Sequence, residues 1–358
     1  MRHLIHLICR KRLKTSICIL FALVALIPLV TIVVSTYYSD RRQIIENRDQ
    51  LARLDLTHVT QELDSEIGSY ENILYQLYTD SELAEKIRQL NNGEASAVAR
   101  NQIRRELRSV FWLRDDITSI TVIAKNNEQV FYDRLSTSLQ TNPCIHNFDL
   151  TDDELFAALS ATKGYTIYPV RFATHFANSD YYLFYIGHKG LNEKAITQTD
   201  AVFLMSVDVD LIRTALKASS FSSEEHYSFI IDQSGHVVFH PDLSCIGEFA
   251  GTSTSDLQSY ITRSTVIGGK NLVYYTQNSA QTGWTVISVL DCAPFTAAID
   301  QRLLISLSIS ALSFLIAFAF VVMITSHLTQ SVEHTCNTIT ELTAGNFSAR
   351  VDLRQEMS

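Results

Sequence analysis

The sequence lacks the short motifs that mark common catalytic and metal sites. It has six cysteines but no Cys-x-x-Cys pair, so neither a zinc knuckle nor a thioredoxin-like redox site is supported. It also has no Gly-x-Ser-x-Gly elbow, no phosphate-binding glycine loop and no His-Glu-x-x-His pair. His236 and His240 are four residues apart, which on a strand is about 13 Å and too far to share one ion. We therefore expect no enzymatic activity, no cofactor and no metal in this chain.

Charged residues are absent from two long apolar blocks, Ser16 to Val34 and Leu303 to Ile324. A membrane-spanning helix needs about 20 mostly apolar residues, so we predict transmembrane helices at 16–36 and 303–326. The alternative for the first block is a cleaved secretory signal. Its apolar run is longer than a signal peptide requires, and no small-x-small cleavage site follows, so an uncleaved anchor is favoured.

The charges that flank the first block indicate its orientation. Five basic residues and no acidic residue precede it, so residues 1–15 should remain in the cytoplasm. Two spans then return residues 327–358 to the cytoplasm and leave 37–302 outside the cell membrane. This outer region carries 22 Lys and Arg against 34 Asp and Glu. That acidic balance argues against a nucleic acid or an anionic membrane surface as its partner.

Only three cysteines fall within the outer region: Cys144, Cys245 and Cys292. Because three is an odd number, they cannot form a complete disulfide framework. A single bridge between Cys144 and Cys245 and a set of free buried thiols are both compatible with the sequence.

The first part of the outer region predicts a long helix followed by an antiparallel sheet. Apolar residues recur at spacings of three and four from Leu56 to Leu77, which favours a helix over 37–90. Thr151 and Glu154 form a capping box in front of a short helix. β-favouring residues predict five strands, at 117–124, 129–132, 165–172, 181–187 and 201–209. Together these elements define a first module over 37–218.

The remainder, 219–302, predicts a second and smaller module of the same type. The turn at Asp232 to Gly235 separates two short strands, a helix is expected at 255–263, and two further strands precede Pro294. The predicted fold class is therefore α+β, with two antiparallel-sheet modules on one long N-terminal helix.

Several segments resemble the double-Cache sensor regions of bacterial receptors, in particular membrane sensor histidine kinases. The segments that carry the resemblance are Ile27-Pro-Leu29, Ile73-Leu-Tyr-Gln-Leu-Tyr-Thr-Asp80, Phe229-Ile-Ile-Asp-Gln-Ser-Gly-His-Val-Val-Phe-His-Pro-Asp242 and Thr282-Gly-Trp-Thr-Val-Ile287. Thr338-Ile-Thr-Glu-Leu-Thr-Ala-Gly-Asn-Phe-Ser-Ala-Arg-Val351 looks like the start of a HAMP domain, so 327–358 is interpreted as a partial HAMP. The resemblance implies two PAS-like Cache modules, a membrane-distal and a membrane-proximal one, and a homodimer.

In amino-acid-binding relatives, an Asp at the end of the last distal strand anchors the ligand amine, and Asp208 matches that position. Strand alternation independently places Asp208 on the face of Leu204 and Ser206, opposite Met205 and Val207. The alternative is an Asp that caps the following helix. An Arg-x-Trp-Tyr cluster of these relatives is absent here, which argues against amino acids as ligands.

Other polar and aromatic residues of the first module are candidates for the same pocket. They suit a small carboxylate, amine or sugar, although each can also be an ordinary core or surface residue. These candidates are Tyr132, Arg134, Tyr165, Tyr168, Arg171 and Tyr182.

The expected function is the sensor portion of a two-component histidine kinase. It would bind a small extracellular ligand, or a ligand-loaded binding protein, and relay the signal through the HAMP helix. No phosphoacceptor or ATP-binding domain occurs within this sequence, so we expect no kinase activity of the chain itself. The alternatives are the input region of a chemoreceptor or a cyclic-dinucleotide enzyme, and a membrane-anchored binding protein that transmits no signal.

Overall fold

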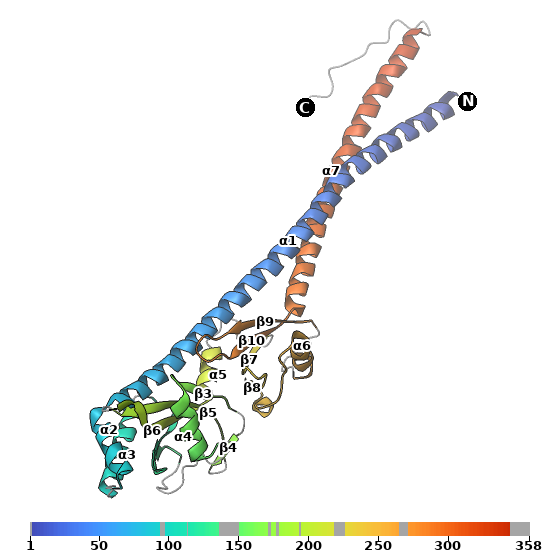
Figure 1. Ribbon diagram of the computed structural model, residues 1–358. Helices are drawn as coiled ribbons and strands as arrows, with labels where there is room; N and C mark the ends of the chain where they lie inside the picture. The colour runs from blue at the N-terminus through green and yellow to red at the C-terminus, as the bar shows by residue number, and fades with distance from the viewer. Residues whose placement is uncertain are drawn as a thin grey trace. The chain divides into compact units, whose positions relative to one another are not determined.

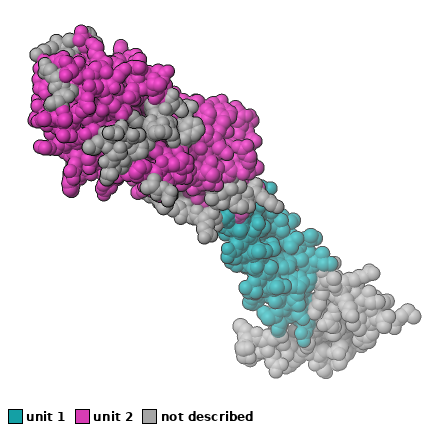
Figure 2. Space-filling model, turned by 90° about the horizontal axis from the view of Figure 1, so that it is seen from below, with its two compact units in different colours: residues 1–47, 294–358 teal, residues 48–293 magenta. Residues whose placement is uncertain are grey.

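The structure is a computed structural model. It describes residues 2–93, 97–112, 114–135, 150–170, 173–176, 179–192, 195–217, 226–264 and 271–343. The chain forms two compact units (Figure 2), one made of residues 1–47 with 294–358 and the other of residues 48–293.

The first unit is built from the N-terminal part of helix α1 (Arg2–Thr79) and from helix α7 (Ala293–Thr343). Among the described residues, Cys18–Thr79 and Ala293–Val332 are long and apolar enough to cross a membrane. Their most apolar 18-residue windows have mean hydropathies of 2.8 and 2.6, and none of either window is buried. A helical segment of this length with exposed apolar side chains is stable in lipid rather than in water. Both helices are thus candidate membrane spans, and they contain the predicted segments 16–36 and 303–326.

The second unit confirms the α+β class and the apolar stripe on the long helix. Along α1 the predicted residues from Leu56 to Leu77 are buried, and they pack in one core with residues of two separate antiparallel sheets. Figure 1 shows α1 running along both sheets.

The predicted helix end at residue 90 is wrong, because α1 stops at Thr79. Asp80 is extended, with φ −71° and ψ 117°, and its side chain accepts the N–H of Leu83 at 2.9 Å. It therefore caps a new helix, α2 (Ser81–Asn91). A further amphipathic helix that was not predicted, α3 (Ala97–Val110), buries Ile103 and Leu107.

The first module contains a six-stranded sheet. Its order is β2-β1-β6-β5-β3, with β4 paired to β5, and every pairing is antiparallel. Within the predicted strand at 165–172, β3 covers only three residues, and β4 follows that range as a strand that was not predicted, so six strands stand where five were expected. The bounds are β1 (Ile117–Ala124), β2 (Gln129–Asp133), β3 (Thr166–Tyr168), β4 (Ala173–Phe176), β5 (Ser179–Asn192) and β6 (Ala195–Asp208).

The two faces of this sheet have different cover. Met205 and Val207 of β6 belong to the core that contains α1, as the sequence alternation required. Leu204, on the other face, packs with Leu155 and Leu159 of α4 (Asp152–Ala161). The predicted capping box of Thr151 and Glu154 begins α4 and is confirmed. Helix α5 (Asp210–Lys217) follows β6 directly.

The second module contains a four-stranded antiparallel sheet in the order β8-β7-β10-β9. One of its faces is covered by α6 (Thr254–Arg263), through Leu257, Tyr260 and Ile261, and the other belongs to the core that contains α1. One residue, Cys292, separates β10 from α7. The bounds are β7 (His226–Ile231), β8 (Val237–Phe239), β9 (Leu272–Asn278) and β10 (Thr285–Asp291), with a 3-10 turn at Leu243–Cys245.

Candidate functional site

A row of polar side chains crosses the six-stranded sheet on the face turned away from α1. The strand register makes each member the lateral neighbour of the next, and neighbours in register point to the same face. Across β2, β1, β6, β5 and β3 the row consists of Asp133, Ser119, Ser206, Tyr185 and Tyr168.

Hydroxyl groups at the centre of the row are bonded to one another. The Ser119 and Ser206 hydroxyl oxygens are 2.5 Å apart, and Thr118 donates to the Ser206 hydroxyl at 3.0 Å and to its carbonyl at 3.1 Å. All three residues are buried, as is Asp133, only 7% of which is exposed. Buried polar groups are costly unless they are hydrogen-bonded, and these hydroxyls are partners of one another. The polar row beside the leucines of α4 is therefore a candidate binding surface.

Asp208 lies two residues beyond Ser206, at the end of β6 and on the same face. Its Oδ1 accepts the backbone N–H of Asp210 at 3.0 Å, so it does cap the start of α5, as the alternative predicted. Burial raises the pKa of Asp208; the bond from Asp210 opposes this and the nearby Asp116 adds to it. A half-buried carboxylate of raised pKa can also meet a cationic or hydroxyl group of a ligand.

The other predicted residues do not gather around Asp208. Tyr168 lies on its face, where it packs against the α4 cluster. Tyr132, Tyr165 and Tyr182 pack on the opposite face, against the core that contains α1. Arg171 lies outside the described residues. The structure therefore brings two of the predicted residues to one face and three to the other.

Two of the residues on the α1 side have specific aromatic neighbours. The Tyr132 ring is 4.9 Å from the ring of Phe111, which follows α3. The Tyr165 ring is 4.5 Å from His188, which stacks on Tyr78 of α1 at 4.3 Å. These contacts give both tyrosines a packing role.

Arg134 also has a local partner. It forms an ion pair with Asp115 at 2.9 Å, and its guanidinium carbon lies 6.0 Å from the Phe111 ring centroid. Its charge is therefore already matched within the module.

Sequence reasoning missed Asp133, Ser119, Ser206 and Tyr185. Strand alternation was applied to Asp208 but not to the tyrosines of β2 and β5. Alternation places Asp133 rather than its neighbour Tyr132, and Tyr185 rather than Tyr182, on the face of Asp208.

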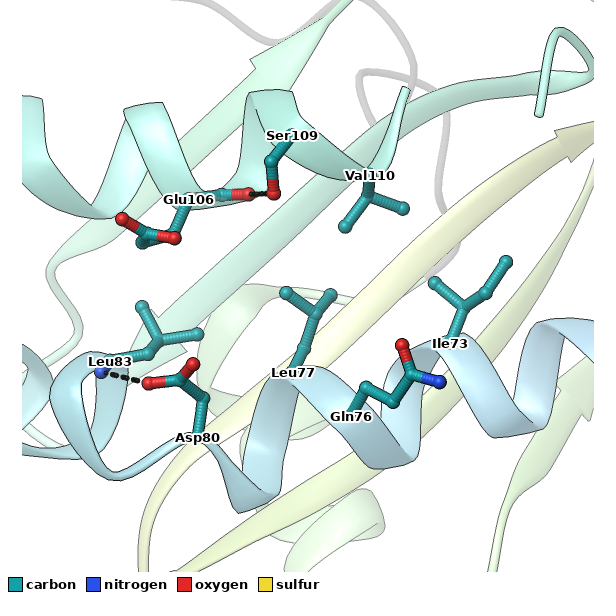
Figure 3. A pocket seen from close by; sticks show the side chains of 8 residues that line it. All are labelled: Ile73, Gln76, Leu77, Asp80, Leu83, Glu106, Ser109 and Val110. Atoms are coloured by element: carbon teal, nitrogen blue, oxygen red, sulfur yellow. Dashed lines mark hydrogen bonds between the residues drawn. The ribbon is translucent and has the colours of Figure 1, made fainter. Parts of the chain in front are cut away.

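A separate surface pocket of about 170 Å³ lies where α1, α2 and α3 meet. Figure 3 shows the carboxylates of Asp80 and Glu106 on facing sides of it, with Leu77 and Leu83 as apolar wall. It contains none of the predicted ligand residues, and Asp80 is engaged in capping α2. Its lining is Ile73, Gln76, Leu77, Asp80, Leu83, Glu106, Ser109 and Val110.

Two histidines of the second module have hydrogen-bond partners close to them in the chain. His240 is fully buried and its Nδ1 accepts the N–H of Asp242 at 3.0 Å, while His236 is bonded to Ser234. Within the described ranges, no group of three or more His, Cys, Asp or Glu side chains could hold a metal ion. Cys245 and Cys292 are free thiols, and Cys144 lies outside the described residues.

Comparison with known proteins identified similar solved structures. No protein-family model and no curated protein matched the sequence. The chain is similar to the ligand-binding domain of the Pseudomonas fluorescens chemoreceptor CtaA in complex with L-leucine, with 9% identity and a TM-score of 0.47 over 71% of this chain and 97% of that chain. It is also similar to the ligand-binding domain of Mlp24 with asparagine, with 14% identity and a TM-score of 0.48 over 73% and 99% of the two chains. For the sensor domain of the V. cholerae histidine kinase DctB, the identity is 11% and the TM-score 0.45 over 70% and 97%.

Proposed function

We propose that this chain is the input half of a double-Cache transmembrane receptor, which binds a small extracellular ligand in its first module. The observation that carries the proposal is the continuity of α1. One helix contains a candidate span and, further along, the buried stripe that packs on both sheets. The second candidate span, α7, begins two residues after β10. Both spans are thus direct continuations of elements in the sensor core.

The polar row supports a ligand with several hydrogen-bonding groups. Hydroxyls, two tyrosines and the carboxylates of Asp133 and Asp208 are grouped on one face, next to apolar side chains of α4. A small carboxylate, amine or sugar fits this mixture. The ligand can alter the signal only by as much as its affinity differs between two conformations of the sensor.

The proposed output is a histidine kinase, reached through a HAMP helix that continues α7, in a homodimeric receptor. The sequence resemblance at 338–351 supports this relay. A chemoreceptor or cyclic-dinucleotide output is the second candidate, because the same input architecture serves either. We place residues 37–302 outside the cell and both termini in the cytoplasm, on the strength of the basic N-terminal flank.

The test is ligand binding by the full chain in lipid nanodiscs, first by thermal-shift screening of small carboxylates, amines and sugars and then by calorimetry. Asp208→Asn keeps an oxygen that can accept the Asp210 N–H, so the cap survives while the charge is lost. We expect its affinity for the ligand found to fall about tenfold or more, as for a lost bond to a charged group.

Asp210→Asn is the matched control, because this neighbouring carboxylate is exposed and pairs with Arg213 at 3.1 Å. It should leave the affinity unchanged. Equal affinity of Asp208→Asn and the parent chain would remove Asp208 from the site. A ligand bound between residues 226 and 290 would move the site to the second module.

A further inference from the structure

Arg114 lies between α3 and β1 and is bonded to one flank of α1. Its guanidinium pairs with Glu66 at 2.6 Å and donates to the Ser69 hydroxyl at 2.8 Å. Its central carbon also lies 4.4 Å from the centroid of the Tyr70 ring. The Arg114 side chain is only 22% exposed, so these contacts are less screened than those of a surface ion pair. They fix both the rotation and the axial position of α1 against the first module.

The same arginine is bonded to Asp116 at the start of β1, at 2.7 and 3.1 Å. Tyr70 of α1 donates to the Asp116 carboxylate at 2.5 Å. Burial opposes ionisation of Asp116, but the bonds from Arg114 and Tyr70 outweigh it and hold the pKa of this carboxyl below its usual value. The Asp116 carbonyl accepts the backbone N–H of Asp208 at 3.0 Å. The end of β6 is therefore tied to α1 through Asp116.

The opposite flank of α1 is bonded to the second module. Asp64 lies two residues before Glu66, and two residues on an α-helix are separated by about 200° around its axis. The Asp64 carboxylate accepts the Ser279 hydroxyl and the N–H of Ala280, the latter at 3.3 Å. Ser279 and Ala280 form the start of the turn between β9 and β10. Four residues after Asp64, a Cβ on Gly68 would be 3.1 Å from the Gln281 side chain, which shows how closely this turn approaches α1.

We propose that Arg114 is a positioning residue that couples the Asp208 end of β6 to α1, and that Asp64 passes the resulting movement of α1 to the β9–β10 turn. The inference rests on the proposed function, which places the ligand at Asp208. Since the two modules hold opposite flanks of α1, a rotation or axial shift of the helix strains both sets of bonds together. The turn leads through β10 to α7, so this route joins the ligand-binding face to the second candidate span. Tight packing makes such elements move between discrete arrangements rather than deform gradually.

The test is hydrogen exchange, read by mass spectrometry, on the full chain in nanodiscs without any ligand. Peptides over 205–209 and 279–285 report the two ends of the route, and the peptide over 254–263 in α6 is the internal reference. Arg114→Gln should accelerate exchange at both ends on the order of tenfold relative to α6, since bonds to a charged group are lost. Arg100→Gln is the control: it removes an ion pair with Glu128, also at 2.7 Å, from α3 of the same module.

Two further variants test the coupling without a change of charge. Tyr70→Phe removes only the bond to Asp116, and it should accelerate exchange at both ends less than Arg114→Gln does. It also serves as the test variant if Arg114→Gln does not fold. Ser279→Ala acts at the other end and should accelerate exchange over 205–209, because coupling between two sites is reciprocal.

Acceleration confined to the mutated module, or equal acceleration that includes α6, would overturn the proposal. The first outcome would mean that Arg114 stabilises contacts within the first module only. The second would mean that it is a general determinant of folding stability. No ligand is added, so failure here is distinguishable from failure of ligand binding at Asp208.

Discussion

Leu159 of α4 packs directly on the backbone of Gly187 in β5. A Cβ added to Gly187 would lie 2.7 Å from Leu159 Cδ2 and 2.9 Å from its Cδ1. Leu159 is only 1% exposed, so it has little room to move aside. The contact brings α4 close to the face that carries the polar row, and it depends on the missing side chain.

Gly187→Ala should therefore destabilise the sensor by about 1 to 3 kcal/mol, as overpacking of a core does. Thermal unfolding of the full chain in nanodiscs measures this. Gly164→Ala is the matched control, because a Cβ there meets nothing within 4 Å. Equal melting temperatures for the two variants would show that Leu159 and α4 shift to accommodate the added methyl group without loss of stability.

The buried histidines predict a loss of stability on mild acidification. Burial lowers the pKa of both His188 and His240 in the folded chain, whereas an unfolded histidine titrates near pH 6.5. Below about pH 6.5 the unfolded state therefore binds more protons than the folded state, and folding stability falls with decreasing pH. The melting temperature should fall as the pH is lowered below about 6.5.

His240→Gln should reduce the dependence of the melting temperature on pH below about 6.5, whatever its effect on stability at pH 7.5. His58→Gln is the control, since the His58 side chain is 73% exposed on α1. A pH slope that is unchanged in His240→Gln would assign the acid sensitivity to other groups.

The hydroxyl pair in the polar row predicts non-additive mutations. Ser206→Ala leaves the buried Ser119 hydroxyl without its 2.5 Å neighbour, at a cost of about 1 to 3 kcal/mol. Removing both hydroxyls leaves neither serine group orphaned, and Thr118 keeps its bond to the Ser206 carbonyl. The Ser119→Ala, Ser206→Ala double variant should therefore cost clearly less than the sum of the single variants. A double-mutant cycle from denaturant unfolding measures the difference, and strict additivity would contradict the bond.

The topology can be checked at Asn92, the C-cap residue that follows α2. A cysteine at this position should react with a membrane-impermeant maleimide in intact cells, because we place residues 37–302 outside. A cysteine replacing Ser358 should react only after lysis. The reverse pattern would invert the orientation, and with it the side on which the ligand is sensed. Both substitutions belong in a background in which Cys144, Cys245 and the other native thiols are replaced by serine.

Local patterns in the sequence determined much of this protein. The two charge-free blocks require an apolar environment, and they mark the candidate spans without reference to any contact. The stripe from Leu56 to Leu77 and the capping box at Thr151 depend only on residues within a few helical turns of one another. The strand at 117–124 was located at the observed bounds, because a polar turn follows it.

Only the structure showed where α1 ends, and tertiary contacts decided which residues share a site. Leu83, Ile87 and Leu90 continue a helical period, so the periodicity could not reveal that Asp80 breaks the helix and caps a new one. The polar row depends on the registers of five strands, which are fixed by contacts between residues far apart in the chain. The contacts of Arg114 depend on Ser69 of α1, 45 residues upstream, so no local pattern could predict them. For the polar row and the contacts of Arg114, the deciding energy comes from packing and charge pairing between distant segments, which local propensity does not contain.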